Sequence, residues 1–180
     1  MNKELYQEVE IPEGIEANLD GTELTIKGPD GEVKREFKIG KLYFKKEGNK
    51  ILLGNEKSTK NEKRLMSTLA SHIRNMIKGV QKKFEYKLKI CFSHFPITVD
   101  IKDNQATIKN FLGEKVARKC KIFKDAEVKI DKEIITITSS NKEIAGQVAA
   151  NFENATKVGN RDRRVFQDGI FITSKCGVEI

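Results

Sequence analysis

Hydrophobic and polar residues alternate in two distant stretches of the chain, as they do in strands that are buried on one face. The alternating pairs are Leu24 with Ile26 and Val99 with Ile101. A two-residue period places such side chains on one face of a strand. Because the turn pairs Asp20-Gly21 and Asp103-Asn104 lie beside these stretches, each stretch predicts a β-hairpin.

A longer period, with apolar residues three and four positions apart, follows each strand region and predicts one amphipathic helix in each half. The first stripe consists of Leu65, Leu69, Ile73, Met76, Ile77 and Val80, and the second of Ile144, Val148, Phe152 and Ala155. Side-chain oxygens at Ser58-Thr59 and at Ser140-Asn141 are suited to cap the helix starts. Gly79 and Gly159 are suited to end the helices.

The two halves also align with each other without gaps at a spacing of 82 residues. The matches are Ile15 with Ile97, Thr25-Ile26-Lys27 with Thr107-Ile108-Lys109, and Gly31-Glu32 with Gly113-Glu114. Chance similarity between polar hairpins is the alternative, but the order of strands and helix agrees as well. Each helix must bury its stripe against its own sheet. We therefore predict an α+β fold with two tandem copies of a small domain, residues 1–82 and 83–180, each a mainly antiparallel sheet packed against one helix.

Charge narrows the choice of partners. The 180 residues include 34 Lys and Arg against 26 Asp and Glu, a net charge of +8. Such an excess favours a polyanion, and nucleic acid is preferred over an anionic membrane because no basic segment forms an amphipathic stripe with aromatic anchors. No apolar run approaches the roughly 20 residues of a membrane span, and the N-terminal residues lack the apolar core of a signal peptide. We expect a soluble, intracellular protein.

Motifs for catalysis or metal binding are not found. The three cysteines, Cys91, Cys120 and Cys176, form no CxxC pair, which indicates a reduced cytosolic compartment. His72 and His94 are the only histidines, and on an extended segment Cys91 and His94 would point to opposite faces. No HExxH, GxSxG or Walker-type spacing occurs. We expect no catalytic residue, metal, cofactor or small-molecule substrate.

Arginine is unevenly distributed in this lysine-rich chain. Three of its seven arginines lie within Arg161–Arg164. A guanidinium group binds phosphate with two parallel hydrogen bonds, so this cluster favours a phosphate-bearing partner. A solvated loop, or arginines paired with acids such as Asp162 and Asp168, is the alternative.

Two segments concentrate positive charge. Lys78–Lys89 carries five lysines against one glutamate, and its apolar residues alternate with the charges. An ordinary solvated strand face explains this pattern as well as RNA contact does. Lys157–Arg164 carries four basic residues against one aspartate, where the second helix is expected to end. The partial negative charge of a helix C-terminus explains Lys157 better than the arginines, because it fades within the last turn.

Several motifs resemble the large-subunit ribosomal protein six family, in its archaeal and eukaryotic branch. They are Glu10–Ile15, Asp20–Phe37, Ser71–Lys89, His94–Val99, Asn110–Lys115 and Asn160–Ile172, and they cover nearly the whole chain in the family's order. The resemblance implies two tandem α+β domains and a structural role in the large ribosomal subunit. It also implies binding of large-subunit ribosomal RNA, mainly by the second domain, near the region where elongation factors dock. The family's C-terminal RNA-binding segment matches Arg161, Asp162, Arg163, Arg164 and Gln167.

We therefore expect a non-catalytic protein of the cytoplasmic ribosome, with ribosomal RNA and neighbouring large-subunit ribosomal proteins as partners and no membrane association. The expected RNA-binding residues are Lys157, Arg161, Asp162, Arg163, Arg164, Gln167, Lys175, Lys82 and Lys83. One alternative is a basic protein-protein interaction module in another ribonucleoprotein assembly. A nuclease or RNA-modifying enzyme is a further alternative, and it would require a carboxylate cluster or a pocket with perturbed titrating groups.

Overall fold

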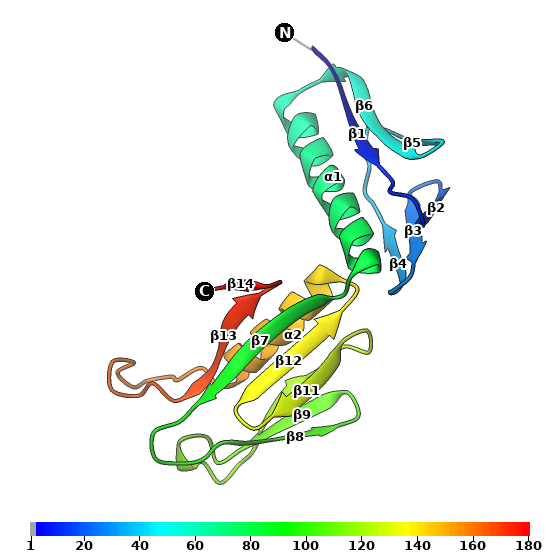
Figure 1. Cartoon of the computed structure of the whole chain (residues 1–180). Helices are drawn as coiled ribbons and strands as arrows, with labels where there is room; N and C mark the ends of the chain where they lie inside the picture. Colours follow the sequence, from blue (N-terminus) through cyan, green and yellow to red (C-terminus); the bar gives the residue numbers. More distant parts are fainter. Residues whose placement is uncertain (1–2) are drawn as a thin grey trace. The chain divides into compact units, whose positions relative to one another are not determined.

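The computed structural model describes residues 3–180, with the backbone alone at positions 3, 4, 56 and 57. The chain divides into two compact units; the first ends at Lys83 and the second begins at Phe84. Each unit has its own hydrophobic core. In each, antiparallel strands pack against one helix (Figure 1), which confirms the predicted α+β fold with two tandem domains.

Within the described residues, the first unit consists of six strands followed by a long helix. Its elements are β1 (Lys3–Glu10), β2 (Glu16–Asp20), β3 (Glu23–Gly28), β4 (Gly31–Glu36), β5 (Tyr43–Glu47), β6 (Lys50–Ser58) and α1 (Lys60–Gln81). The strands form two sheets, in the orders β1-β6-β5 and β2-β3-β4, rather than a single one. Helix α1 contacts β1 and β6 of one sheet and β3 and β4 of the other.

The second unit repeats this order and then extends it. Its elements are β7 (Phe84–Cys91), β8 (Thr98–Lys102), β9 (Gln105–Lys109), the 3-10 turn η1 (Phe111–Gly113), β10 (Arg118–Lys121), β11 (Glu127–Asp131), β12 (Ile134–Ser139), α2 (Lys142–Ala155), β13 (Gly169–Lys175) and β14 (Val178–Glu179). The sheets run β11-β12-β7-β13-β14 and β10-β9-β8. Strand β7 corresponds to β1 of the first unit. Among the described strands β1 has one neighbour, β6, whereas β7 lies between β12 and β13.

Strand register shows that the sheets β2-β3-β4 and β10-β9-β8 match each other at their central strands, β3 and β9. In the first unit Ile26 lies opposite Ala17 and Val33. In the second unit Ile108 lies opposite Val99 and Arg118. Both isoleucines are fully buried. Residue 118 therefore corresponds to residue 33, a spacing of 85 rather than 82, because the turn before β10 is three residues longer.

The helices begin where their caps predict and end elsewhere. Thr59 is the N-cap of α1, and Asn141 caps α2 by accepting from the backbone N–H of Glu143 at 3.0 Å. The predicted end at Gly79 is wrong, because α1 runs to Gln81 and Gly79 is buried inside it.

The second helix stops earlier than predicted. It ends at Ala155, so Gly159 lies beyond it in the loop that leads to β13. The side chains that α2 buries are Ala145, Val148, Ala149 and Phe152. No helix in the described part of the chain has the length and apolarity needed to cross a bilayer.

Candidate nucleic-acid interface

The loop between α2 and β13, residues 156–168, carries the arginine cluster, and hydrogen bonds fix both of its ends. Thr156 is 3% exposed, and its Oγ1 accepts from the backbone N–H of Ile170 at 2.9 Å. The same hydroxyl lies 3.2 Å from the carbonyl of Phe152, to which it donates. One buried side chain thus joins the end of α2 to the start of β13. We call residues 156–168 the arginine loop.

Arg118 provides a second anchor for the start of this loop. Its Nη1 donates to the carbonyl oxygens of Ala155 at 2.9 Å and Lys157 at 3.3 Å. Its Nε and Nη2 donate to the two carboxylate oxygens of Glu114 at 2.8 and 2.6 Å. The guanidinium group also lies 4.3 Å from the centre of the Phe111 ring. A planar fork can make all these contacts at once, which an ammonium group cannot.

Asp162 organises the backbone at the tip of the arginine loop. Its Oδ1 accepts from the backbone N–H of Arg164 at 2.9 Å, and its carbonyl oxygen accepts from the N–H of Phe166 at 2.9 Å. Gln167 Nε2 donates to the carbonyl of Arg164 at 3.1 Å. The carboxylate of Asp162 therefore stabilises a turn, as aspartate side chains commonly do.

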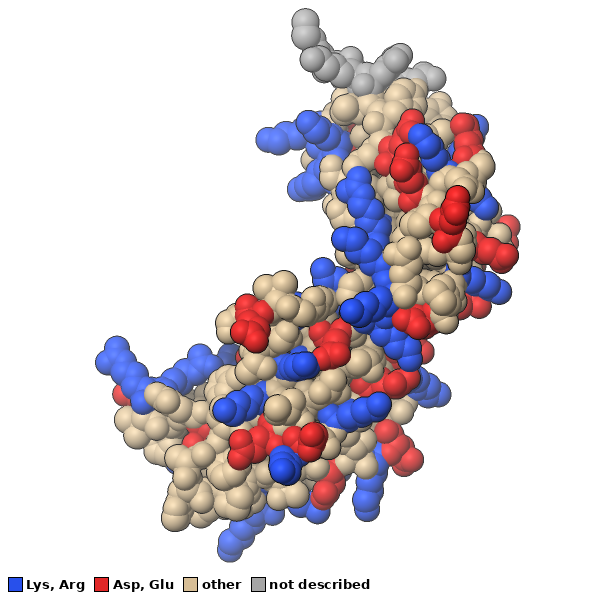
Figure 2. All heavy atoms as spheres, in the orientation of Figure 1, with Lys and Arg blue, Asp and Glu red and all other residues tan. Residues whose placement is uncertain are grey.

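The three arginines of the loop are exposed. Arg161 lies 4.8 Å from the centre of the Phe166 ring. Among the side chains that the structure describes, none of the three guanidinium groups forms an ion pair. Figure 2 shows basic side chains projecting from the surface where this loop lies. The alternative in which Asp162 and Asp168 neutralise the cluster does not match the contacts of these acids.

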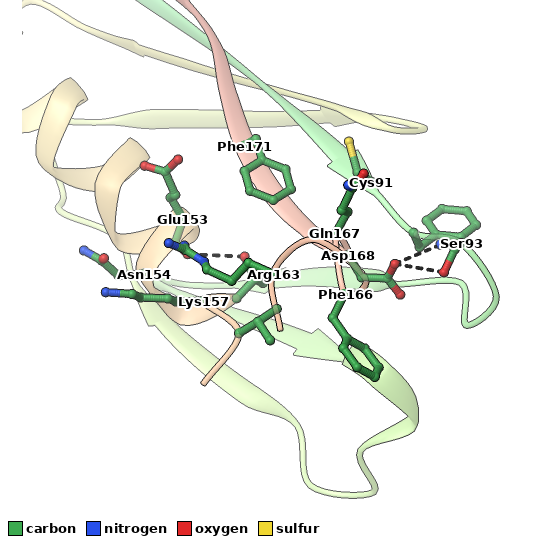
Figure 3. A pocket seen from close by; sticks show the side chains of 13 residues that line it. Cys91, Ser93, Glu153, Asn154, Lys157, Arg163, Phe166, Gln167, Asp168 and Phe171 are labelled. Carbon is green, nitrogen blue, oxygen red and sulfur yellow. Dashed lines mark hydrogen bonds between the residues drawn. The ribbon is translucent and has the colours of Figure 1, made fainter. Parts of the chain in front are cut away.

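Asp168 bonds elsewhere. It is 6% exposed, and its Oδ1 accepts from the backbone N–H and the hydroxyl of Ser93, at 3.1 and 3.0 Å. This contact ties the end of the arginine loop to the turn after β7 (Figure 3). The loop is thus held at three places, by Thr156, Arg118 and Asp168.

Glu114 has a lowered pKa, first because Arg118 donates hydrogen bonds to its carboxylate and also because of the charges of Arg118 and Arg161. The charge of Arg118 is therefore balanced inside the protein. Arg161, Arg163 and Arg164 remain for a partner outside it. This separates one structural arginine from three that are exposed.

The structure brings together only part of the predicted set. Lys157, Gln167 and the residues of Arg161–Arg164 lie on one loop. Lys175 lies at the opposite end of β13, about 20 Å away at 3.3 Å per residue. Lys82 and Lys83 belong to the first unit, where the backbone N–H of Lys83 donates to Asp30 Oδ2 at 3.3 Å.

Sequence reasoning missed the anchoring residues Arg118, Thr156 and Ser93. Their partners are distant in sequence, and threonine and serine carry no pattern of their own. A signal for Arg118 did exist, because it is an arginine where the first repeat has the buried Val33. The gap-free alignment pairs Val33 with Lys115 instead and hides this difference.

A cavity of about 800 Å³ opens beside the arginine loop. Its lining includes Phe171 from β13, Lys157 after α2, and Arg163, Gln167 and Asp168 from the loop. Figure 3 shows Phe171 on the β13 side, Lys157 near the end of α2, and Asp168 beside Ser93. Aromatic, cationic and carboxylate groups thus border one space.

A nuclease or RNA-modifying enzyme would require a metal-binding cluster, or groups that could act as a nucleophile or as an acid or base near neutral pH. No group of three His, Cys, Asp or Glu side chains among the described residues could hold a metal ion. Burial raises the pKa of the Cys120 thiol to about 11, which makes it a poor nucleophile. Burial, with a smaller effect of Cys176, raises the pKa of Tyr86 to about 12, so that neither group suits acid–base work near neutral pH.

The fold is that of a basic protein with two tandem α+β domains, and the second domain carries the arginine loop after its helix. The family model described as ribosomal protein L6 matches residues 11–83 and again residues 95–169. The chain belongs to the ribosomal protein L6 family.

Three curated relatives, each named large ribosomal subunit protein uL6, are similar over nearly their full lengths. The protein of Staphylothermus marinus is 45% identical over 172 residues, 93% of this chain and 93% of its own. That of Methanobrevibacter smithii is 44% identical over 171 residues, covering 95% and 96%. That of Methanococcus vannielii is 43% identical over 173 residues, covering 96% and 95%. Each of these names is that of a ribosomal protein, in agreement with the resemblance in the sequence.

Proposed function

We propose that this protein is a structural constituent of the large ribosomal subunit and binds large-subunit ribosomal RNA through the arginine loop. The observation that carries the proposal is the presence of three exposed arginines, without ion pairs among the described side chains, on a loop whose ends are fixed. The chain's net charge of +8 and its family membership support the same partner.

The binding chemistry follows from the form of folded RNA. An RNA helix hides its base edges in a deep, narrow groove, so proteins contact mainly its phosphates, 2′-hydroxyls and shape. Arg161, Arg163 and Arg164 supply planar donors that match phosphate geometry. Because Asp162 and Thr156 hold the backbone in place, less conformational entropy is lost when the loop binds.

Asp162 and Gln167, which match the family's RNA-binding segment, act in this proposal by shaping the loop. Lysines supply less specific charge. Lys157 lies on the loop itself, whereas Lys175, Lys82 and Lys83 would contact other parts of the RNA. The resemblance to the family also supports a place near the region where elongation factors dock, among neighbouring large-subunit proteins of the cytoplasmic ribosome.

Filter binding to transcribed large-subunit ribosomal RNA tests the proposal. Arg163→Ala with Arg164→Ala removes two phosphate contacts, so the affinity should fall. The negative slope of log K against log salt should become shallower, by about 1.5. Lys124→Ala with Lys129→Ala, two exposed lysines of the same unit, is the control with equal charge loss and should change both quantities much less. Equal affinity and slope for wild type and the arginine variant would exclude this loop as the RNA site.

The position near the elongation factors has a separate test. Large subunits that lack this protein should stimulate GTP hydrolysis by an elongation factor less than the same subunits after the wild-type protein is added back. Equal stimulation by the two kinds of subunit would refute this placement and would leave the RNA-binding test unaffected.

A further inference from the structure

We propose that the cavity beside the arginine loop receives one unstacked base of the ribosomal RNA, which stacks on Phe171 and donates an exocyclic amino group to Asp168. This inference rests on the proposed function, because the same RNA strand would place its phosphates on the arginines. Sequence-selective recognition of RNA commonly uses unstacked bases held against aromatic rings.

The size and walls of the cavity suit a flat, partly apolar ligand. Its volume of about 800 Å³ falls within the roughly 300–1,000 Å³ of small-molecule sites. Phe171 is 39% exposed and borders the cavity. Phe92, from the turn after β7, is also 39% exposed and lines the same space. Two partly exposed aromatic rings thus line one space.

Glycine at position 169 positions the Phe171 ring. A Cβ atom at Gly169 would lie 3.2 Å from Phe171 Cζ and 3.4 Å from the carbonyl oxygen of Thr156, and the φ angle there is +157°. The ring therefore lies close over this glycine, at the junction of the arginine loop and β13.

Asp168 provides a polar group inside the cavity. The residue is 6% exposed, and Oδ1 is already engaged twice by Ser93. Oδ2 has no hydrogen-bond partner among the described residues, and it therefore keeps some contact with solvent. Because Asp168 lines the cavity, the proposal takes Oδ2 as the oxygen that accepts from the base.

The charges are arranged for a nucleotide whose base enters first. Two carboxylates border the cavity, buried Asp168 and exposed Glu153, together with the exposed cations Arg163 and Lys157. A carboxylate repels phosphate but accepts from an amino group, so the base would meet Asp168 and the phosphates would meet the cations. Adenine, guanine and cytosine carry such an amino group, whereas uracil has only its ring N3–H as a donor, so the contact as proposed predicts a base other than uracil.

Variants at residue 171 test the stacking contact in the full-length protein with transcribed large-subunit ribosomal RNA. Phe171→Leu keeps an apolar side chain but loses the flat ring, and it should weaken binding about five- to a hundredfold, the range for one stacked base. Its salt dependence should match that of wild type, because no phosphate contact is lost. Phe171→Tyr keeps the ring and should bind as wild type does.

Chemical probing of the bases identifies the nucleotide. One base should be protected by the wild-type protein and by Phe171→Tyr but reactive with Phe171→Leu, and it should be A, G or C. Replacing that base with uracil should weaken wild-type binding more than Phe171→Leu binding, because the stacking contact and the hydrogen bond to Asp168 hold the same base and are therefore coupled.

Each contrary result has a distinct meaning. If Phe171→Leu binds as tightly as wild type while the double arginine variant is weak, the cavity does not hold a base and the RNA proposal stands. A protected uracil would likewise overturn the inference. If the double arginine variant is unaffected as well, the proposed function itself fails.

Discussion

Arg118 occupies in the second unit the place that Val33 occupies in the first. Arg118 lies opposite Ile108 on the central strand of the sheet β10-β9-β8, and Val33 lies opposite Ile26 on the central strand of the sheet β2-β3-β4. Val33 is 6% exposed and belongs to the core, whereas the Arg118 guanidinium reaches the end of α2 and holds the arginine loop. One change between two copies of the same unit thus connects the sheet to the proposed RNA site.

Arg118→Val, which restores the first unit's residue, should loosen the arginine loop. Amide exchange in residues 157–168 should become faster, because two carbonyl anchors are lost. RNA affinity should fall about three- to tenfold through lost preorganisation. The salt slope should stay the same, since Glu114 already neutralises this arginine. Lys119→Val, at an exposed neighbour on β10, is the control, and equal exchange rates in the two variants would contradict the anchoring role.

Thr156→Val tests the bond that joins α2 to β13. Valine has nearly the same shape but leaves the buried N–H of Ile170 without its acceptor, which should lower the free energy of unfolding by about 1–3 kcal/mol. Urea denaturation measures this change. Thr173→Val on the same strand removes a hydroxyl that donates to Lys87 at an exposed site, and the loss there should be clearly smaller.

Gly28→Ala should destabilise the first unit. A Cβ atom at this position would lie 2.3 Å from Val80 Cγ1 and 3.3 Å from the Val80 carbonyl oxygen, so the β3–β4 turn and the end of α1 would have to separate. A cost of about 1–3 kcal/mol in the free energy of unfolding is expected. Gly159→Ala is the control, because the added atom meets nothing within 4 Å and the backbone there has no positive φ. A thermal midpoint for Gly28→Ala equal to wild type would show that the helix end is not packed so closely.

Acid should release the arginine loop. Since the folded-state pKa of Glu114 is lowered, its ion pair stabilises the loop above the unfolded-state pKa. That contribution is lost as the pH falls below the ordinary range of a glutamate and through the lowered folded-state pKa. The protection factors of the amides in residues 157–168, which compare observed exchange with the intrinsic rate at the same pH, should therefore fall at low pH in wild type. Glu114→Gln should show low protection already at pH 7, with little further change on acidification.

The order of strands and helices was largely predictable because it rests on periodicity. Leu24 with Ile26, and the stripe from Leu69 to Val80, showed which faces would be buried. The division of each unit's strands into two sheets was not predictable, because alternation fixes a strand's faces and not its neighbours. The end of α1 was misjudged because Gly79 reads as a terminator although the helix continues through it.

The arginine cluster was visible in the sequence because its residues are adjacent. Its support was not, since Arg118 lies 39 residues before Lys157 and Ser93 lies 75 before Asp168. Such contacts depend on how distant strands pair. Lys175 looked like part of the cluster along the chain, but an extended strand carries it to the far end of β13.

Co-sedimentation through a high-salt gradient tests the central claim most directly. Purified large subunits that lack this protein would be incubated with wild type or with the Arg163→Ala, Arg164→Ala variant and then centrifuged. RNA binding through the arginine loop predicts that wild type remains with the subunits while the variant stays near the top of the gradient. Equal retention of both proteins, or release of both, would contradict it.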